Sequence, residues 1–157
     1  MVDDDKSGPK ATEALADEMM DASLQAAQFE RVRTAQQTEK AEDYVEMIDD
    51  LINAYGEARV VELAKRFGVS HATVNKVVKR LQRDGLVHTR PYRSIFLTEE
   101  GRQLAEWSRW RHQIVLNFLR AIGVSERAAK LDAEGIEHYV SDETLAAFAR
   151  IAEQAKK

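Results

Sequence analysis

The stretch ARVVELAKRFGVSHATVNKVVKRLQRDGLV, residues 58–87, decides the fold. Apolar residues recur at helical spacing on both sides of Gly68, which predicts a helix over 59–67, a short turn and a second helix over 71–83. Ser70 stands just before the second helix, where its hydroxyl can cap free backbone N–H groups. A helix–turn–helix of this kind is typical of proteins that read DNA in the major groove.

The next residues, 86–98, predict a short β-hairpin. Leu86–His88 and Ser94–Leu97 form its strands, and Pro91 lies in the turn. A hairpin directly after the two helices makes the motif a winged helix-turn-helix. The predicted DNA contacts are polar or basic residues of the second helix and the wing: Ser70, His71, Thr73, Asn75, Lys76, Lys79, Arg80, Arg90, Tyr92 and Arg93.

This mixture of side chains suits a recognition helix, because short polar groups can reach base edges while Lys and Arg hold phosphates. Residues 57–93 carry nine basic and three acidic side chains, whereas residues 1–50 carry five basic and fourteen acidic ones. Residues 126–146 are acidic again, which favours a polyanion-binding segment beside a cation-binding one. The alternatives are random charge scatter and a trihelical packing module with a solvated basic face, and His71 fits a surface histidine equally well.

Composition narrows the class of protein. The chain has 157 residues, of which 44% are hydrophobic, with 7 Gly, 2 Pro and no Cys. Few turn residues disfavour β-sandwiches and barrels, and the lack of Cys excludes disulfides, thiolate metal sites and cysteine nucleophiles. No apolar run approaches the roughly 20 residues that span a bilayer, and the acidic N-terminus is unlike a secretory signal. We therefore expect a cytoplasmic protein, mainly α with a small β-hairpin.

The remaining helices complete the predicted domain organisation. We expect helices over 41–55, from 99 to about 122, over 126–140 and from 142 onward, and inward-facing Trp107 and Ile122 on the long one. Residues 1–40 are predicted to be a partly disordered N-terminal extension. The winged helix-turn-helix domain would span 41–98, and a connecting helix with a helical metal-binding and dimerisation domain would span 99–157.

Acidic and histidine side chains on three of these helices form a second pattern. Asp43 and Glu46 lie three residues apart, His112 borders the apolar stripe of the long helix, and EGIEHYV places Glu134, Glu137 and His138 on one helix face. Oxygen and imidazole donors without thiolate suit hard or intermediate divalent ions such as Mn²⁺. A solvated acidic face and a packing histidine are the alternatives, so the residues alone make a metal site plausible and no more.

Taken together, the helix–turn–helix, YRSIFLTEEG, RHQIVLNFLRAIGV and AEGIEHYVS resemble the DtxR family of metal-dependent repressors, in its manganese-responsive MntR branch. The resemblance covers roughly residues 41–152. It implies that the six acidic and histidine residues above are metal ligands, around two Mn²⁺ ions per subunit. Iron-type relatives place Met and Cys where this chain has Asp43 and Glu137.

The resemblance implies a homodimeric, Mn²⁺-activated repressor that binds a palindromic operator and controls manganese-uptake genes. Metal ligands on both domains would fix the DNA-binding domains at a spacing of about one helical turn, roughly 34 Å. The alternatives are a winged-helix regulator that senses iron or an organic ligand, and a metal-dependent hydrolase. The hydrolase would need an open coordination position and a general base, and it leaves the basic helix–turn–helix unexplained, so we expect no enzyme.

Overall fold

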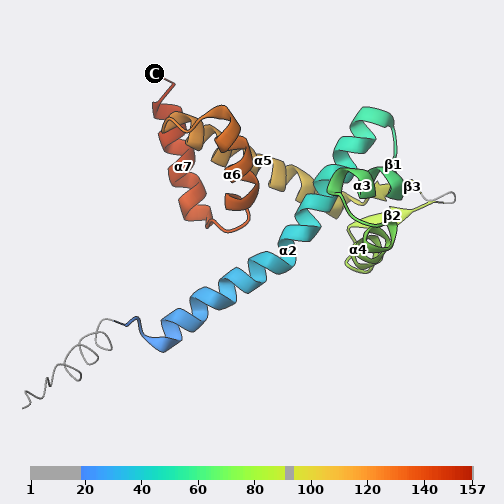
Figure 1. The fold of residues 1–157 in the computed structure, drawn as a ribbon, viewed down its shortest axis with the longest axis horizontal. Coiled ribbons are helices and arrows are strands. Elements are labelled where there is room, and N and C mark those ends of the chain that lie inside the picture. Colours follow the sequence, from blue (N-terminus) through green and yellow to red (C-terminus); the bar gives the residue numbers. More distant parts are fainter. Residues whose placement is uncertain (1–18, 91–93, 157) are drawn as a thin grey trace, which may run out of the picture. The chain divides into compact units, whose positions relative to one another are not determined.

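The computed structural model describes residues 19–90 and 94–156 as helices and a small antiparallel sheet (Figure 1). In chain order the elements are α2 (Ala22–Tyr55), β1 (Ala58–Arg59), α3 (Val60–Phe67), α4 (His71–Arg83), β2 (Val87–Thr89), β3 (Ser94–Leu97), α5 (Glu99–Ala121), α6 (Glu126–Ile136) and α7 (Asp142–Gln154). The predicted fold class, a winged helix-turn-helix followed by a helical dimerisation domain, is confirmed. No helix in the described ranges is long and apolar enough to cross a membrane.

Helix α2 begins well before the predicted start at residue 41. The Asp21 carboxylate accepts hydrogen bonds from the backbone N–H groups of Ser23 (2.9 Å) and Leu24 (3.2 Å), which caps the first turn. No Gly or Pro interrupts residues 22–55, so good helix formers such as Ala, Gln and Glu carry the helix on. Among the described residues, one unit ends at Thr34 and a second runs from Ala35 onward. Residues 22–40 of the extension that was predicted to be partly disordered therefore belong to α2, and residues 1–18 lie outside the described residues.

The helix–turn–helix forms as its sequence predicts. Gly68 ends α3 in the left-handed conformation at φ +64°, which favours glycine because side chains crowd the backbone there. The Ser70 hydroxyl accepts a hydrogen bond of 3.1 Å from the backbone N–H of Thr73 and so caps α4. Two short polar residues and one glycine thus set where the recognition helix begins.

The wing is part of a three-stranded sheet in the order β1-β3-β2. Strands β2 and β3 form the predicted hairpin, with Val87 opposite Leu97. The two-residue β1 also pairs with β3, Ala58 lying opposite Ile95. Sequence analysis missed β1 because two residues show no alternation. The hairpin tip, residues 91–93, lies outside the described residues.

Two hydrophobic cores organise the unit 35–157. The first joins the second half of α2, α3, α4, the sheet and the start of α5; among its members are Ile48, Leu63, Val74, Leu81, Ile95 and Ala105. The second joins α5, α6 and α7 around Val115, Leu119, Ala133 and Leu145, and the rings of Phe118 and Phe148 stack 3.8 Å apart. Helix α5 contributes to both cores and so links the two predicted domains.

The inward orientation predicted for Trp107 and Ile122 is wrong. Trp107 is 42% exposed and stacks on Trp110 with ring centroids 4.8 Å apart, and Ile122 is 55% exposed. The helix turns its smaller residues Ala105 and Ser108 inward at this point, both of them buried. Close packing of α5 here leaves no room for an indole ring.

Candidate metal centre and DNA interface

Four carboxylates lie along one face of α2. Glu39, Glu42, Asp43 and Glu46 follow the spacing 0, 3, 4, 7, which brings them together on a helix. Sequence analysis selected only Asp43 and Glu46. The spacing alone could have pointed to the other two, because it is the same periodicity that identified the apolar stripe.

Two more of the predicted ligand residues, Glu137 and His138, lie in the turn after α6. The sequence predicted a helix through Val140, but α6 ends at Ile136, so Glu137 and His138 leave the helix instead of sharing its face with Glu134. Arg111 of α5 contacts this turn, and its Nη2 donates to the main-chain oxygens of Glu137 and Val140, the latter at 3.3 Å. Both side chains are buried, Glu137 at 4% and His138 at 2% exposure.

One potential metal-binding group consists of His112, Glu134 and Glu137. One oxygen or nitrogen atom of each lies within 4.8 Å of the others. The His112 Nδ1 atom lies 2.6 Å from Glu137 Oε2 and 3.7 Å from Glu134 Oε1. Helix α5, helix α6 and the following turn each contribute one donor, all of them oxygen or imidazole nitrogen.

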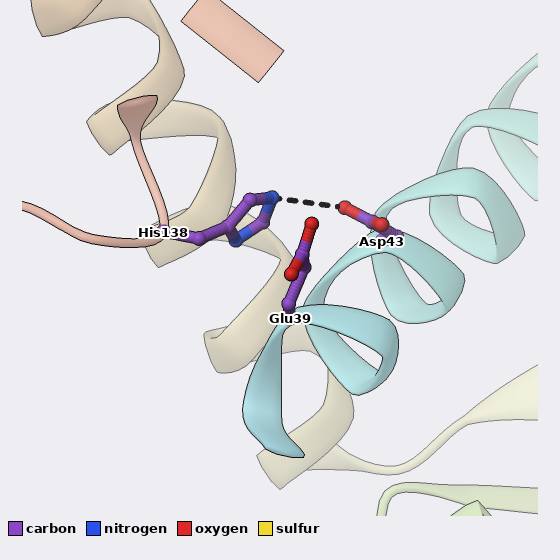
Figure 2. A group of neighbouring side chains, drawn as sticks. All are labelled: Glu39, Asp43 and His138. Carbon is purple, nitrogen blue, oxygen red and sulfur yellow. Dashed lines mark ion pairs between the residues drawn. The ribbon is translucent and has the colours of Figure 1, made fainter. Parts of the chain in front are cut away.

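A second group, Glu39, Asp43 and His138, meets the same distance criterion. Figure 2 shows the His138 ring facing the carboxylates of Glu39 and Asp43 on α2, with Nε2 directed at Asp43 Oδ1, 3.2 Å away. The Tyr139 hydroxyl donates a 2.9 Å hydrogen bond to Glu39 and orients that carboxylate. Glu39 and Tyr139 were both missed at the sequence level.

The two groups adjoin each other. His138 Nε2 lies 3.5 Å from Glu137 Oε1, which connects one group to the other. The remaining predicted ligand, Glu46, accepts a 2.9 Å hydrogen bond from the buried Ser108 hydroxyl and feels the charges of Glu137 and His112. All six predicted ligand residues therefore gather in one region, to which α2, α5, α6 and the turn after α6 contribute.

The histidines act as counter-charges for this acidic region. Hydrogen bonding to Glu137 raises the pKa of His112. Burial lowers the pKa of His138, but hydrogen bonds to Asp43 and Glu42 outweigh it and raise the value to about 10. Burial also raises the pKa of Glu46 and Glu134. The mutual repulsion that we expect among the carboxylates is thus partly balanced by the protein's own imidazoles.

The predicted DNA-contacting side chains of α4 are all solvent-exposed. They lie opposite the buried Val74, Val77, Val78 and Leu81 of the same helix. Ser70 also has a local role, because its hydroxyl contacts that of Thr73 at 2.9 Å and caps the helix. The Arg90 guanidinium lies over the Phe96 ring, 4.8 Å from its centroid. Tyr92 and Arg93 lie outside the described residues.

A basic groove between α2 and α4 extends this surface. Its charged lining residues are Lys40, Lys76, Lys79, Arg80 and Arg83. Arg80 also donates to the main-chain oxygen of Gln37 at 3.4 Å, which ties the recognition helix to α2. Sequence analysis missed Lys40 and Arg83 because Lys40 stands in an acidic stretch and Arg83 at the end of its helix.

Comparison with known proteins places the chain. Residues 36–95 match the family "Iron dependent repressor, N-terminal DNA binding domain", and residues 98–157 match "Iron dependent repressor, metal binding and dimerisation domain". The transcriptional regulator MntR of Escherichia coli O6:H1 (strain CFT073) is 56% identical over 120 residues, 76% of this chain and 77% of that protein. The chain belongs to the MntR branch of this repressor family. The predicted family resemblance is therefore confirmed, and the protein is a transcriptional regulator.

Further relatives agree with this assignment. MntR of Geobacillus kaustophilus is 40% identical over 104 residues, 66% of this chain and 74% of that protein. A solved manganese-dependent transcriptional repressor in complex with manganese is 30% identical, with a TM-score of 0.59 over 74% of this chain and 52% of the other. The manganese regulator SloR is 25% identical, with a TM-score of 0.64 over 72% and 53%. The chain thus spans about half the length of these two structures. The MntR relatives do not favour the alternative of a regulator that senses an organic ligand.

Proposed function

We propose that this member of the MntR branch is a homodimeric repressor that Mn²⁺ activates to bind a palindromic operator of manganese-uptake genes. The observation that carries the proposal is the junction of two donor groups, one reaching onto the first helix of the DNA-binding part and the other onto α5 and α6. A DNA-binding module and a dimerisation module in one chain support the same proposal. We place such a regulator in the cytoplasm, with its DNA.

The donor set fits a divalent ion of Mn²⁺ character. We propose Asp43, Glu46, His112, Glu134, Glu137 and His138 as ligands, with Glu39 as an additional candidate. Carboxylate and imidazole donors suit Mn²⁺, whereas soft thiolate or thioether donors would select other metals. Two adjoining groups support two ions per subunit. A bound divalent ion would supply positive charge that several carboxylates can share.

The domain boundaries follow as part of the proposal. We propose a DNA-binding domain over 41–98, which contains most of the first hydrophobic core, and a helical domain over 99–157, which contains the second; Ala105 of α5 also belongs to the first core. Glu39 and Asp43 lie on α2 beside Lys40, and Lys40 lines the groove next to α4. Side chains that hold this part of α2 against His138 therefore also fix one wall of the basic groove.

DNA recognition would divide between two kinds of side chain. We propose that Thr73 and Asn75 contact base edges, because they lie near the N-terminal end of α4. His71 would lie beside them. Lys76, Lys79, Arg80 and Arg90, together with Tyr92 and Arg93 at the hairpin tip, would contact phosphates. Lys40 and Arg83 would extend the phosphate-binding surface along the groove.

The deciding experiment is a DNA-binding titration at buffered metal concentrations. An operator is first selected from a random duplex pool with Mn²⁺ present, and its affinity is then measured with Mn²⁺, Fe²⁺ and Zn²⁺. We expect Mn²⁺ to activate most fully, although Zn²⁺ can bind more tightly, because affinity follows the Irving–Williams order. Equal activation by Fe²⁺ or Zn²⁺ would overturn the manganese assignment. Sedimentation in the same buffer tests the dimer.

A further inference from the structure

A buried carboxylate outside the proposed ligand set contacts the site. Glu42 is only 8% exposed, which is unusual for a glutamate and requires a partner. Its Oε2 lies 2.6 Å from Nδ1 of His138, whose side chain is 2% exposed. The two residues are 96 positions apart in the chain. This ion pair therefore connects α2 directly to the turn after α6.

The two nitrogens of the His138 ring face different carboxylates. Nδ1 faces Glu42, whereas Nε2 faces Asp43 at 3.2 Å and Glu137 at 3.5 Å. An imidazole can offer a lone pair to a metal ion through one nitrogen while the other nitrogen donates its proton. Only Nε2 is directed into the group formed with Glu39 and Asp43.

We propose that Glu42 is a positioning residue of the metal centre. Its carboxylate accepts a hydrogen bond from the Nδ1–H group of His138 and thereby presents Nε2 to the ion. The proposal rests on the function proposed above. A carboxylate behind a ligating histidine fixes the ring's orientation and tautomer and makes it a stronger donor, and its loss commonly lowers metal affinity about 10- to 100-fold. The same contact joins His138 to α2.

Two other roles are possible for a buried acid at this point. Glu42 could itself bind the ion, or it could serve only as a structural ion pair. If Glu42 is a ligand, its removal should release bound metal and should leave the Nδ1 proton of His138 in place. A structural pair would lower the melting temperature without changing Mn²⁺ affinity in the folded protein. These differences define the test.

The test compares Glu42→Gln and Glu42→Ala with Asp50→Asn in the full chain. Asp50 is an exposed carboxylate on the same helix, and it pairs with Arg109. Arg109 still pairs with Asp49 when Asp50 is replaced, so Asp50→Asn controls for the change in net charge. Mn²⁺ affinity is measured by calorimetry, and the metal-free melting temperature checks folding. Zn²⁺, which is diamagnetic, replaces Mn²⁺ for nitrogen-15 NMR of the His138 ring.

We expect Glu42→Ala to bind Mn²⁺ about 10- to 100-fold more weakly than the unmutated protein. Glu42→Gln should lose less Mn²⁺ affinity, because its amide oxygen can still accept a hydrogen bond from the Nδ1–H group of His138. The Zn²⁺-loaded unmutated protein and Glu42→Gln should show a slowly exchanging Nδ1 proton that Glu42→Ala lacks. If Glu42→Ala unfolds, the isosteric Glu42→Gln still decides, through a loss of Mn²⁺ affinity beyond that of Asp50→Asn.

Three results would overturn the proposal. Mn²⁺ affinities of both Glu42 variants within twofold of Asp50→Asn would leave Glu42 a structural pair. Loss of one bound ion with the Nδ1 proton of His138 retained in Glu42→Ala would make Glu42 a ligand. Both leave the proposed function intact. An unmutated protein that binds no Mn²⁺ would instead remove the proposed function, and this inference with it.

Discussion

The winged helix and the acidic region are held together in opposite ways. The winged helix comes from the continuous stretch 58–97, preceded by α2, and packs around fully apolar residues such as Leu63 and Val74. The acidic region gathers side chains from positions 39–46, 108–112 and 134–138, and its contacts are ion pairs and hydrogen bonds between buried and partly exposed polar groups. The first should fold without metal, whereas the geometry of the second depends on how its charges are balanced.

The largest expected effect comes from Glu137→Ala. Glu137 belongs to the group with His112, 2.6 Å away, and also contacts the other group, since it lies 3.5 Å from His138. We expect the Mn²⁺-dependent gain in operator affinity to disappear, a loss on the order of 100-fold if the coupling is near the upper end of the usual range. Metal-free binding to random duplex DNA should stay unchanged, because the winged helix does not need Glu137.

Fluorescence anisotropy with labelled operator and random duplexes measures both effects. Glu106→Ala is the matched control, because Glu106 is an exposed glutamate of α5. A Glu137→Ala protein that Mn²⁺ still activates would show that the acidic region is not the regulatory site. Equal weakening of metal-free DNA binding would show that the two regions are not as separate as the comparison states.

The winged helix can be tested with two identical substitutions. Val74 is fully buried in the first core, whereas Val61 is 50% exposed on α3. Val74→Ala should lower the free energy of unfolding by about 2 kcal/mol, from lost apolar burial and the cavity left behind. Val61→Ala should stay within about 0.5 kcal/mol of the unmutated protein.

Urea unfolding with and without Mn²⁺ provides the measurement. We expect the same loss in both conditions for Val74→Ala, since Val74 is not among the residues of the acidic region. A loss that Mn²⁺ abolishes would mean that the metal centre, and not the apolar core, determines whether the winged helix folds.

The same contrast explains what the sequence could predict. In the winged helix the turn at Gly68, the cap at Ser70 and the apolar spacing of α4 are local signals, and each predicted element formed. In the acidic region the pairing of Glu42 with His138 spans 96 positions, and no local pattern contains it. The turn after α6 is likewise contacted by Arg111, a residue of another helix. Composition and spacing suggested the donors, while tertiary contacts decided their arrangement.

A smaller effect is expected from Arg111→Lys. The Arg111 Nη2 group donates to the main-chain oxygens of Glu137 and Val140 in the turn after α6, and a lysine carries its donor as a compact ammonium on a more flexible side chain. Looser placement of Glu137 and His138 should weaken Mn²⁺ binding about tenfold. The control is Arg120→Lys, because Arg120 is an exposed arginine of the same helix that pairs with Glu126. Calorimetry compares the Mn²⁺ affinities of the two variants. Equal Mn²⁺ affinities would show that Arg111 does not position Glu137 and His138 for the ion.

The smallest expected effect concerns Lys40, which lies where the two regions meet. Lys40 lines the basic groove beside α4 and neighbours Glu39 on α2. If the groove holds a DNA phosphate, Lys40→Ala should flatten the slope of log affinity against log salt by about 0.9, because one fewer counterion is released. Operator and random DNA should weaken alike, by several-fold at low salt, since a phosphate contact carries no sequence information. Lys40→Arg should keep the slope, and Lys130→Ala, which removes an exposed lysine paired with Glu126 on α6, serves as the charge control. A slope for Lys40→Ala equal to that of Lys130→Ala would exclude a phosphate contact at Lys40. It would then leave the acidic face of α2 as the link between that helix and metal-dependent DNA binding.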